Sequence, residues 1–506
     1  MPTLFSQPQQ VSLRGLFPKA RFIGGRDIQV ASCTANASNC EPGDLFIAIT
    51  AADADGHEEV DEALRRGASA VLSERLLPVS VPNCVVQDTR AAHGALCQAL
   101  AGHPTEQLKT VGISGSLGKT ITSELLASIL RAARQSRGLV NDFIVDDGEL
   151  VLPSDEAATT APELAEHLAR MVRHRCSHAI LEVTQQALAS YHTAGITLDA
   201  AILTNVLRDP VTLGGSAWND REIQSRLFQQ LKPGGFAVIN ADDPVSAFYL
   251  RKLQVPVLTY GIQNEAELSA TIVERSTSEQ TFLLHAGADS IAIRSGMIGD
   301  PHVYNCLAAA AVALVWNIDL ATIARGLEQV DQVAGRLERI SCGQPFSVYV
   351  DRAHTPAALA TSLRTLRQTV SGRVICVYGA EGERRQQARA QLGRVVERGA
   401  HLEVITNDNP RCEEPLAIVH DILDGYARPA RPLIRPDRQA AIEWALGQAQ
   451  AGDAVLIAGK GGATCQELNS RRLPWDDREI ARSWLYAHPG AGEIERPGYF
   501  PVQIFG

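Results

Sequence analysis

The stretch VGISGSLGKT, residues 111–120, decides the fold of the middle of this chain. Val111 and Ile113 alternate with small residues, as they do at the end of a buried strand. Glycines then lead into Lys119 and Thr120, and the following ITSELLASILRAA has apolar residues at helical spacing. A strand, a glycine-rich turn and a helix together predict a phosphate-binding loop.

The residues of this loop suit a nucleotide. Glycines let backbone N–H groups approach phosphate oxygens, and the helix N-terminus adds favourable partial charge. Lys119 can reach the terminal phosphates, and the Thr120 hydroxyl can bind magnesium. The spacing departs by one residue from the common GxxxxGK[ST] form, because Gly112 stands six positions before Gly118. The competing interpretation is an ordinary glycine turn before a core helix.

Composition limits the class of protein. The 506 residues are too many for one core, so we expect two to four domains. The hydrophobic fraction of 45% and the charged fraction of 21% are typical of soluble globular proteins. No apolar run is long enough to span a membrane, and the N-terminus lacks a secretion pattern. Ten scattered cysteines without a CxxC motif predict reduced thiols in the cytoplasm.

The charge pattern makes one lysine stand out. A net charge of −10 argues against nonspecific nucleic-acid binding, so local loops must supply positive potential to any anionic nucleotide. Arginine carries nearly all the positive charge, and lysine is rare. One of the few lysines, Lys119, stands in the glycine-rich loop, which favours a functional role for it.

Several short apolar runs end in polar or glycine-rich tips and alternate with amphipathic helical patterns. The runs are HAILEVTQ, AAILTNV, FAVINADD, SVYVDRAHT, VICVYGAEG, LEVITNDNP and DAVLIAGKGG. Strands that alternate with helices predict parallel α/β sheets covered on both faces. In such sheets ligands bind beyond the carboxyl ends of the strands, so the polar tips are the expected functional positions. We predict three domains, at 1–105, 106–333 and 334–506, with an irregular tail from about 486.

The motifs in their order resemble those of the Mur ligases, and within that family the MurE-type UDP-N-acetylmuramoyl-tripeptide synthetases. The resemblance covers roughly residues 25–485. It is carried by PGDLF (42–46), DGH (55–57), SGSLGKT (114–120), LEVTQQAL (181–188), TNVLRD (204–209), NADD (240–243), GRLERI (335–340), DRAHTP (351–356), DNPR (408–411), GKGG (459–462) and WDDRE (475–479).

The resemblance implies a fold and a reaction. The fold is the three-domain Mur ligase architecture, with an N-terminal UDP-substrate domain, a central P-loop ATPase-like domain with a parallel sheet, and a C-terminal Rossmann-like domain for the amino acid. Such ligases use ATP and Mg²⁺ to phosphorylate a carboxylate of a UDP-muramoyl peptide. The amine of an amino acid then attacks the acyl phosphate, and DNPR is the pattern of members that add diaminopimelate. The expected partners are therefore small molecules, and we expect a monomer.

The resemblance also carries roles onto individual residues. Catalytic roles fall on Lys119, Glu182, Arg336 and Asp351, and metal binding falls on Thr120 and Glu182. The expected nucleotide-binding residues are Gly115, Ser116, Gly118, Lys119, Thr120, Asn305, Arg336 and His354. The expected substrate-binding residues are Arg208, Arg389, Asn409, Arg411 and Gly459.

This chain departs from the family pattern at several of the family's site positions. Gln186 stands where a metal-ligating histidine is expected, Pro210 replaces a second histidine, and Gln224 replaces a lysine whose carbamate supports a second magnesium ion. Outside that cluster, Asn36–Ala37–Ser38 replaces the DSR that contacts uridine in the family. The other changed positions are Leu117 and Ile121 in the loop motif, Thr212 for aspartate, His302 for asparagine, and Ala463 for glutamate. Glutamine offers only a neutral carbonyl, whereas hard dications prefer anionic oxygen, so the second magnesium site should be severely weakened.

Three functional hypotheses follow. The first is a divergent but active ATP-dependent ligase that adds an amino acid, with meso-diaminopimelate suggested by DNPR, to UDP-N-acetylmuramoyl-L-alanyl-D-glutamate. The second is a noncatalytic relative that keeps the fold, with or without the nucleotide site, and acts as a binding or regulatory partner. The third is a ligase for another carboxylate and amine. The phosphate loop, Glu182 and DNPR favour an enzyme, whereas Gln186, Pro210 and Gln224 favour the noncatalytic relative.

Overall fold

The computed structural model describes residues 10–50, 54–154, 160–207, 217–383, 386–469 and 471–492. These residues divide into two compact units. The first unit comprises the residues up to Val206 together with Ala217–Leu268 and Leu307–Gly326. The second comprises Leu207, Ser269–Cys306 and the residues from Leu327 onward. The three-domain division predicted from the sequence stays a proposal.

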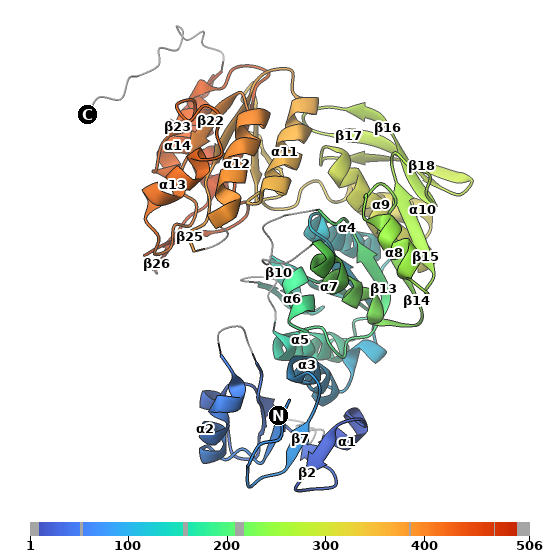
Figure 1. The fold of residues 1–506 in the computed structure, drawn as a ribbon. Helices are drawn as coiled ribbons and strands as arrows, with labels where there is room; N and C mark the ends of the chain where they lie inside the picture. Colours follow the sequence, from blue (N-terminus) through green and yellow to red (C-terminus); the bar gives the residue numbers. More distant parts are fainter. Residues whose placement is uncertain are drawn as a thin grey trace, which may run out of the picture. The chain divides into compact units, whose positions relative to one another are not determined.

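The N-terminal part of the first unit is built on a five-stranded sheet. Its strand order is β2-β7-β6-β5-β4, and the four strands from β7 to β4 are parallel. The bounds are β2 (Arg21–Ile23), β4 (Cys33–Thr34), β5 (Leu45–Ile47), β6 (Ala70–Ser73), β7 (Asn83–Val85), α1 (Leu13–Leu16), α2 (Val60–Arg65) and α3 (Thr89–Leu100). A separate pair, β1 (Val11–Ser12) and β3 (Gln29–Val30), is antiparallel. Helix α3 lies beside helix α5 (Ala161–Arg173) (Figure 1).

The larger sheet of the first unit places the phosphate loop. Its strands run in the order β11-β10-β9-β12-β8-β13-β14-β15, and the six from β9 to β15 are parallel. The bounds are β8 (Lys109–Ser114), β9 (Arg137–Val140), β10 (Ile144–Asp146), β11 (Val151–Pro153), β12 (His178–Glu182), β13 (Leu198–Leu203), β14 (Leu231–Asn240) and β15 (Val257–Gly261). Strand β8 lies between β12 and β13, so the residues that follow these three strands meet at one sheet edge.

Helices pack against this sheet as the apolar patterns predict. They are α4 (Lys119–Ala132), α5, α6 (Gln185–Ala189), α7 (Ala217–Gln229) and α8 (Ser246–Lys252). Farther along the chain are α9 (Asp300–Val315) and α10 (Leu320–Glu328). In α5 the predicted core positions Leu164, Leu168 and Met171 are buried. A capping box formed by Thr160 and Glu163 begins this helix, which satisfies two backbone donors at its N-terminus.

The second unit contains two groups of strands. Strands β16 (Leu268–Arg275), β17 (Gln280–Ala286) and β18 (Asp289–Ser295) are neighbours in that order, and β17 and β18 pair antiparallel. A six-stranded sheet has the order β19-β20-β24-β21-β22-β23, and its strands are parallel except for the edge strand β19. Their bounds are β19 (Glu338–Ile340), β20 (Ser347–Asp351), β21 (Val374–Tyr378), β22 (Leu402–Ile405), β23 (Leu433–Ile434) and β24 (Ala454–Ala458).

Helices flank the six-stranded sheet of the second unit, and α11, α12 and α13 lie side by side (Figure 1). The bounds are α11 (Pro356–Thr369), α12 (Gln386–Gly399), α13 (Pro415–Leu423), α14 (Arg438–Gln448) and α15 (Asp477–Ala487), with a hairpin of β25 (Cys465–Leu468) and β26 (Arg471–Pro474). The mixed α/β architecture with parallel sheets is therefore confirmed. No helix among the described residues is long and apolar enough to cross a membrane. Most of the predicted irregular tail lies outside the described residues.

Candidate functional site: a phosphate loop and a basic loop junction

The phosphate loop links β8 to the N-terminus of α4. Gly115 and Gly118 have φ values of +136° and +88°, in the region that favours glycine. A Cβ atom on Gly115 would lie 2.1 Å from the Thr204 Oγ1 atom, so no larger residue fits there. The loop is therefore a tight backbone cradle that leads into a 14-residue helix, as the sequence predicts.

The residues after β13 hold this loop in place. The Asn205 side chain accepts a hydrogen bond from the Leu117 N–H at 2.9 Å and donates one to the Leu117 carbonyl at 2.9 Å. The Thr204 hydroxyl also donates to the Leu117 carbonyl, at 2.7 Å. The Ser116 N–H donates to the Asn205 carbonyl at 3.0 Å. We call these hydrogen bonds from Thr204 and Asn205 to the loop backbone the latch. Leu117 takes part through its main-chain groups, which explains how an apolar residue is accommodated in this loop.

Lys119 and Glu182 meet beside the loop. The Lys119 ammonium group donates to the Gly115 carbonyl at 3.1 Å and lies 3.8 Å from Glu182 Oε1. Glu182 ends β12, and its carboxylate also accepts from the Asp142 N–H at 3.2 Å. Its side chain is fully buried, whereas that of Lys119 is 17% exposed. Thr120, 3% exposed, follows on the first turn of α4. Three residues expected at the nucleotide and metal therefore converge at the carboxyl ends of β8 and β12.

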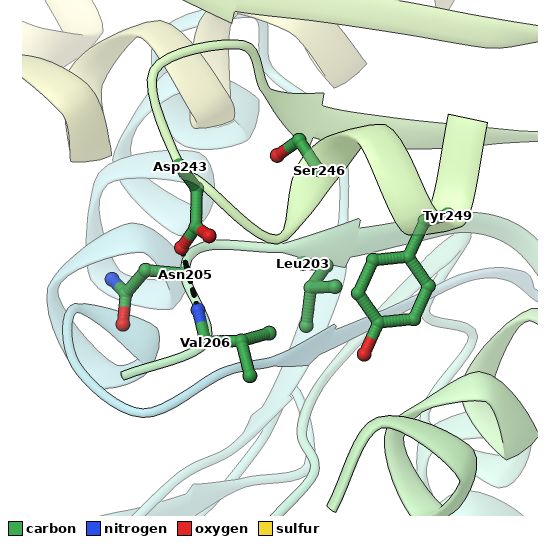
Figure 2. Close-up of a pocket in the computed structure, with 6 residues that line it drawn as sticks. All are labelled: Leu203, Asn205, Val206, Asp243, Ser246 and Tyr249. Atoms are coloured by element: carbon green, nitrogen blue, oxygen red, sulfur yellow. Dashed lines mark hydrogen bonds between the residues drawn. The ribbon is translucent and has the colours of Figure 1, made fainter. Parts of the chain in front are cut away.

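A shallow pocket without room for a water molecule lies at the neighbouring strand ends. Figure 2 shows its six lining residues, among them Asp243 and Asn205. Asp243 accepts hydrogen bonds from the Val206 N–H at 2.6 Å and the Val245 N–H at 2.7 Å. Burial raises the pKa of this carboxyl. Asp242 accepts from three N–H groups in residues 262–264. The two acidic residues of NADD thus hold backbone segments in place behind the loop.

Of the residues expected around a second magnesium ion, the two that the structure describes are neutral glutamines. Gln186 is exposed on the short helix α6. Gln224 on α7 is 2% exposed, and its Oε1 atom is buried without a hydrogen-bond partner among the described residues. Helices α6 and α7 are joined by a hydrogen bond from Gln185 to Asp220 at 2.7 Å. Arg208, Pro210 and Thr212 lie outside the described residues.

In the second unit, Asp351 ends β20 and is 8% exposed. Burial raises the pKa of its carboxyl, although the Ser362 hydroxyl that donates to it and nearby Arg336 act in the opposite direction. Arg336 itself is half-buried. His354 is exposed, and its Nδ1 atom lies 2.8 Å from the Arg352 carbonyl.

Helix α9 carries the remaining expected nucleotide contact, Asn305, which is 5% exposed. His302 precedes it on this helix and is buried, with Nε2 2.7 Å from the Ser295 Oγ atom. Burial lowers the pKa of His302 to about 3, so its imidazole is neutral. His302 therefore acts as a packed core residue that anchors the end of β18.

The DNPR and GKGG loops meet at the carboxyl ends of β22 and β24. The Lys460 ammonium group donates to Asn409 Oδ1 at 2.6 Å and lies 3.6 Å from Asp408 Oδ1. A Cβ atom on Gly459 would lie 2.3 Å from Asp408 Oδ2, so the two loops approach closely only because this residue is glycine. Half-buried Asn409 and buried Gly459 and Lys460 form a junction close to Arg411.

Arg411 has a carboxylate on either side. Its Nε atom lies 3.2 Å from Glu467 Oε2, and its Nη2 atom lies 3.8 Å from Glu381 Oε2. Its φ of +56° is unusual for a residue with a side chain, and the hairpin holds it there through the Arg411 N–H, which donates to the Glu467 carbonyl at 3.1 Å. The Arg411 side chain remains 21% exposed. This arrangement offers a positive and a negative group side by side.

Arg389 occupies a different environment from the one expected of a substrate contact. Its side chain is 2% exposed and pairs with Glu413 at 2.5 Å and Asp421 at 2.9 Å. It also donates to the Glu381 carbonyl at 3.0 Å. The hydrogen bonds that its guanidinium donates to Glu413 and Asp421 raise the pKa of Arg389. A guanidinium that is buried and already paired with two carboxylates joins α12 to α13, which argues against the contact with an incoming carboxylate expected from the resemblance.

Comparisons with known proteins agree with the fold and the site described above. Residues 113–313 match the model of the Mur ligase middle domain, and residues 335–461 match that of the Mur ligase glutamate ligase domain. A UDP-N-acetylmuramoyl-L-alanyl-D-glutamate–2,6-diaminopimelate ligase of Geobacillus kaustophilus is 35% identical over 469 residues. That similarity covers 91% of this chain and 95% of the relative. The chain belongs to the Mur ligase family.

Solved structures agree with the assignment of this chain to the Mur ligase family. A UDP-N-acetylmuramoyl-L-alanyl-D-glutamate–2,6-diaminopimelate ligase superposes with a TM-score of 0.67 at 29% identity, covering 95% of this chain and 99% of that structure. MurF ligase from Thermotoga maritima, solved in complex with ADP, has a TM-score of 0.58 at 18% identity and covers 90% of this chain and 97% of its own. The second comparison supports the fold alone.

Sequence reasoning named the TNVLRD motif without giving roles to Thr204 and Asn205, and it did not single out Glu467. The signal for the first pair was their place directly after a strand that neighbours β8, where side chains reach the phosphate loop. Glu467 had no comparable signal, because its approach to Arg411 depends on the β25–β26 hairpin folding back onto the DNPR loop.

Proposed function

We propose that this Mur ligase is an ATP-dependent enzyme that joins meso-diaminopimelate to UDP-N-acetylmuramoyl-L-alanyl-D-glutamate in peptidoglycan precursor synthesis. ATP would donate its terminal phosphoryl group to the acceptor carboxylate, with ADP leaving. The amine would then attack the activated carbonyl carbon, and phosphate would leave as the amide forms. The observation that carries the proposal is the convergence of Lys119 and Glu182 on a built phosphate loop, in a chain related over 91% of its length to such a ligase.

The phosphate loop fits a nucleotide. Gly115 lets the loop lie against Thr204 and Asn205, where any Cβ atom would clash, and the hydrogen bonds of Asn205 fix the loop backbone before a ligand arrives. A preformed cradle avoids the free energy of ordering the loop on binding. Lys119 would then exchange part of its contact with the Gly115 carbonyl for phosphate oxygens.

A first magnesium ion also fits this site. The Glu182 carboxylate and the Thr120 hydroxyl are the hard oxygen ligands that magnesium prefers, and both lie at the loop. The ion would neutralise phosphate charge. The burial of Glu182 and its hydrogen bond from the Asp142 N–H keep its carboxylate oriented toward Lys119.

A second magnesium ion does not fit. Gln224 is neutral and buried, and Gln186 is exposed, so neither supplies the anionic oxygen that a second dication beside a triphosphate needs. We therefore expect slow turnover, because phosphoryl transfer loses part of its charge stabilisation.

For the amino acid, we propose that Arg411 and Glu467 act as a pair. A free amino acid carries a carboxylate and an ammonium group close together, and these two side chains lie 3.2 Å apart with 21% and 28% exposure. Arg411 would bind the carboxylate, and Glu467 would bind the ammonium group in place of the glutamate that is absent at Ala463. Substrate groups would then replace part of the present ion pair.

A noncatalytic role remains the second candidate, and the specific observation in its favour is Gln224. We further propose that the protein is monomeric, acts on small molecules and works in the cytoplasm, as expected for this family. The test of function is mass-spectrometric detection of the UDP-muramoyl tripeptide after incubation with ATP, magnesium, UDP-muramoyl dipeptide and meso-diaminopimelate. Product that forms with the wild type and the Lys109→Ala control, but not with Lys119→Ala, supports the ligase. Nucleotide binding without product supports the second candidate.

A further inference from the structure

Three metal-ligating side chains that the phosphate-loop chemistry does not use meet in the N-terminal part of the first unit. They are Cys33 on β4 and His93 and Cys97 on α3, and their ligand atoms all lie within 4.8 Å of one another. His93 and Cys97 are four residues apart on one helix, so they share a face. Cys33 comes from a strand about 60 residues earlier, so folding brings this set together.

The ligand types identify the metal. Two thiolates and one imidazole form a set typical of zinc, with Zn–S bonds of about 2.3 Å and Zn–N bonds of about 2.0 Å. Tetrahedral geometry with these bond lengths requires ligand atoms roughly 3.5 Å apart, which small rotamer adjustments within the present cluster can reach. We propose that Cys33, His93 and Cys97 bind one zinc ion, with water in the fourth position.

The surroundings suit such an ion. Cys97 is 6% exposed and packs against Ala161 and Ala165 of α5, while Cys33 and His93 are half-buried. Two thiolates balance the charge of a zinc dication, so the bound site is neutral and its desolvation cost is limited. The half-buried side leaves a path for entry of the ion and room for the water ligand.

A zinc ion here would fasten a weak edge of the N-terminal sheet. Strand β4 has two residues, stands at the edge of the sheet and, within the described part of the chain, pairs with β5 alone. After Ala35 come Asn36, Ala37 and Ser38, which stand where the family pattern has the uridine-contacting DSR. The metal would thus hold the strand that leads into this segment against helix α3, independently of the phosphate loop.

The test uses the full-length protein, reduced and stripped of metal by dialysis against chelator. Zinc is added back, and its stoichiometry and affinity are measured by elemental analysis and competition with a coloured chelator. Cobalt serves as a spectroscopic probe, since thiolate ligands produce charge-transfer absorption. We expect one zinc per chain, cobalt–thiolate bands and a higher thermal midpoint with zinc. Cys33→Ser and His93→Ala should each weaken binding at least about 10-fold, as expected for loss of a ligand.

Cys33 and His93 carry the test, because replacing the buried Cys97 would also disturb packing. Cys412→Ser is the matched control, since this thiol is exposed in the second unit and should leave zinc affinity unchanged. Substoichiometric zinc in the reduced wild type would overturn the proposal. So would affinity that survives both Cys33→Ser and His93→Ala. A Cys33–Cys97 disulfide in the purified protein, with no metal uptake after reduction, would also overturn it.

Discussion

The phosphate loop and the DNPR loop both present a basic side chain, but they differ in what that side chain meets. Lys119 has the Glu182 carboxylate 3.8 Å away and a backbone carbonyl at 3.1 Å. Arg411 lies between Glu467 at 3.2 Å and Glu381 at 3.8 Å. The first arrangement suits an anion with many oxygens, whereas the second suits a zwitterion. A basic residue in a motif therefore predicts a ligand only once its acidic neighbours are known.

The largest expected effect is on stability, and it should distinguish Arg389, which we interpret as structural, from Arg411, which we propose binds the amino acid. Arg389→Ala leaves Glu413 and Asp421 without their buried partner and should lower the free energy of unfolding by about 3 kcal/mol. Arg411→Ala should cost stability less than about 1 kcal/mol, because its ion pairs are partly exposed, but it should raise the KM for the amino acid. Chemical denaturation and steady-state kinetics give the two values. The opposite assignment of effects would make Arg389 the ligand contact.

The next effect concerns nucleotide binding. Lys119→Ala should weaken ATP binding about 100-fold, because a charged donor to phosphate is lost at a partly buried site. Calorimetry measures this affinity. Lys109→Ala, at the exposed start of strand β8, which precedes the phosphate loop, should bind ATP as the wild type does. Equal ATP affinity in the wild type and Lys119→Ala would contradict the assignment of this loop.

The residues in these two predictions also show which features of the structure can be predicted from the sequence. The strand–loop–helix pattern at 109–132 and the parallel α/β architecture were predictable, because glycine, lysine and apolar spacing act locally. The pairing of Arg389 with Glu413 and Asp421 was not, because it depends on how α12 and α13 pack. The Cys33, His93 and Cys97 cluster was missed for a similar reason, since a search for CxxC spacing does not detect one strand cysteine facing an i, i+4 pair on a helix.

A smaller effect should follow from loosening the latch of the phosphate loop. Asn205→Ala leaves the Leu117 N–H without its side-chain acceptor, which costs about 1–3 kcal/mol if water does not replace it, and leaves the Leu117 carbonyl with Thr204 as its remaining side-chain donor. We expect ATP affinity to fall about 10-fold in calorimetry. Asn264→Ala, an exposed change in the same unit, is the control. Unchanged ATP affinity in Asn205→Ala would mean that the loop holds its shape without this latch.

The smallest effect should be seen at the amine side of the Arg411 pair. Glu467→Gln keeps the size of the side chain and removes its charge, so the KM for meso-diaminopimelate should rise about fivefold, with the KM for ATP unchanged. Glu479→Gln on the exposed face of α15 should change neither value. If Ala463→Glu lowers the KM for meso-diaminopimelate whereas Glu467→Gln leaves it unchanged, the amine is bound at position 463 rather than at Glu467.

The most direct test of the account is the rate of UDP-muramoyl tripeptide formation by the wild type and Gln224→Lys, each with and without added bicarbonate. The account predicts slow product formation by the wild type. Gln224→Lys should be at least about 10-fold faster when bicarbonate can convert the lysine amine to an anionic carbamate, whereas Gln224→Met should not be faster. A wild-type rate of ~1 s⁻¹ or more, or a Gln224→Lys rate indifferent to bicarbonate, would contradict the claim that position 224 limits the reaction.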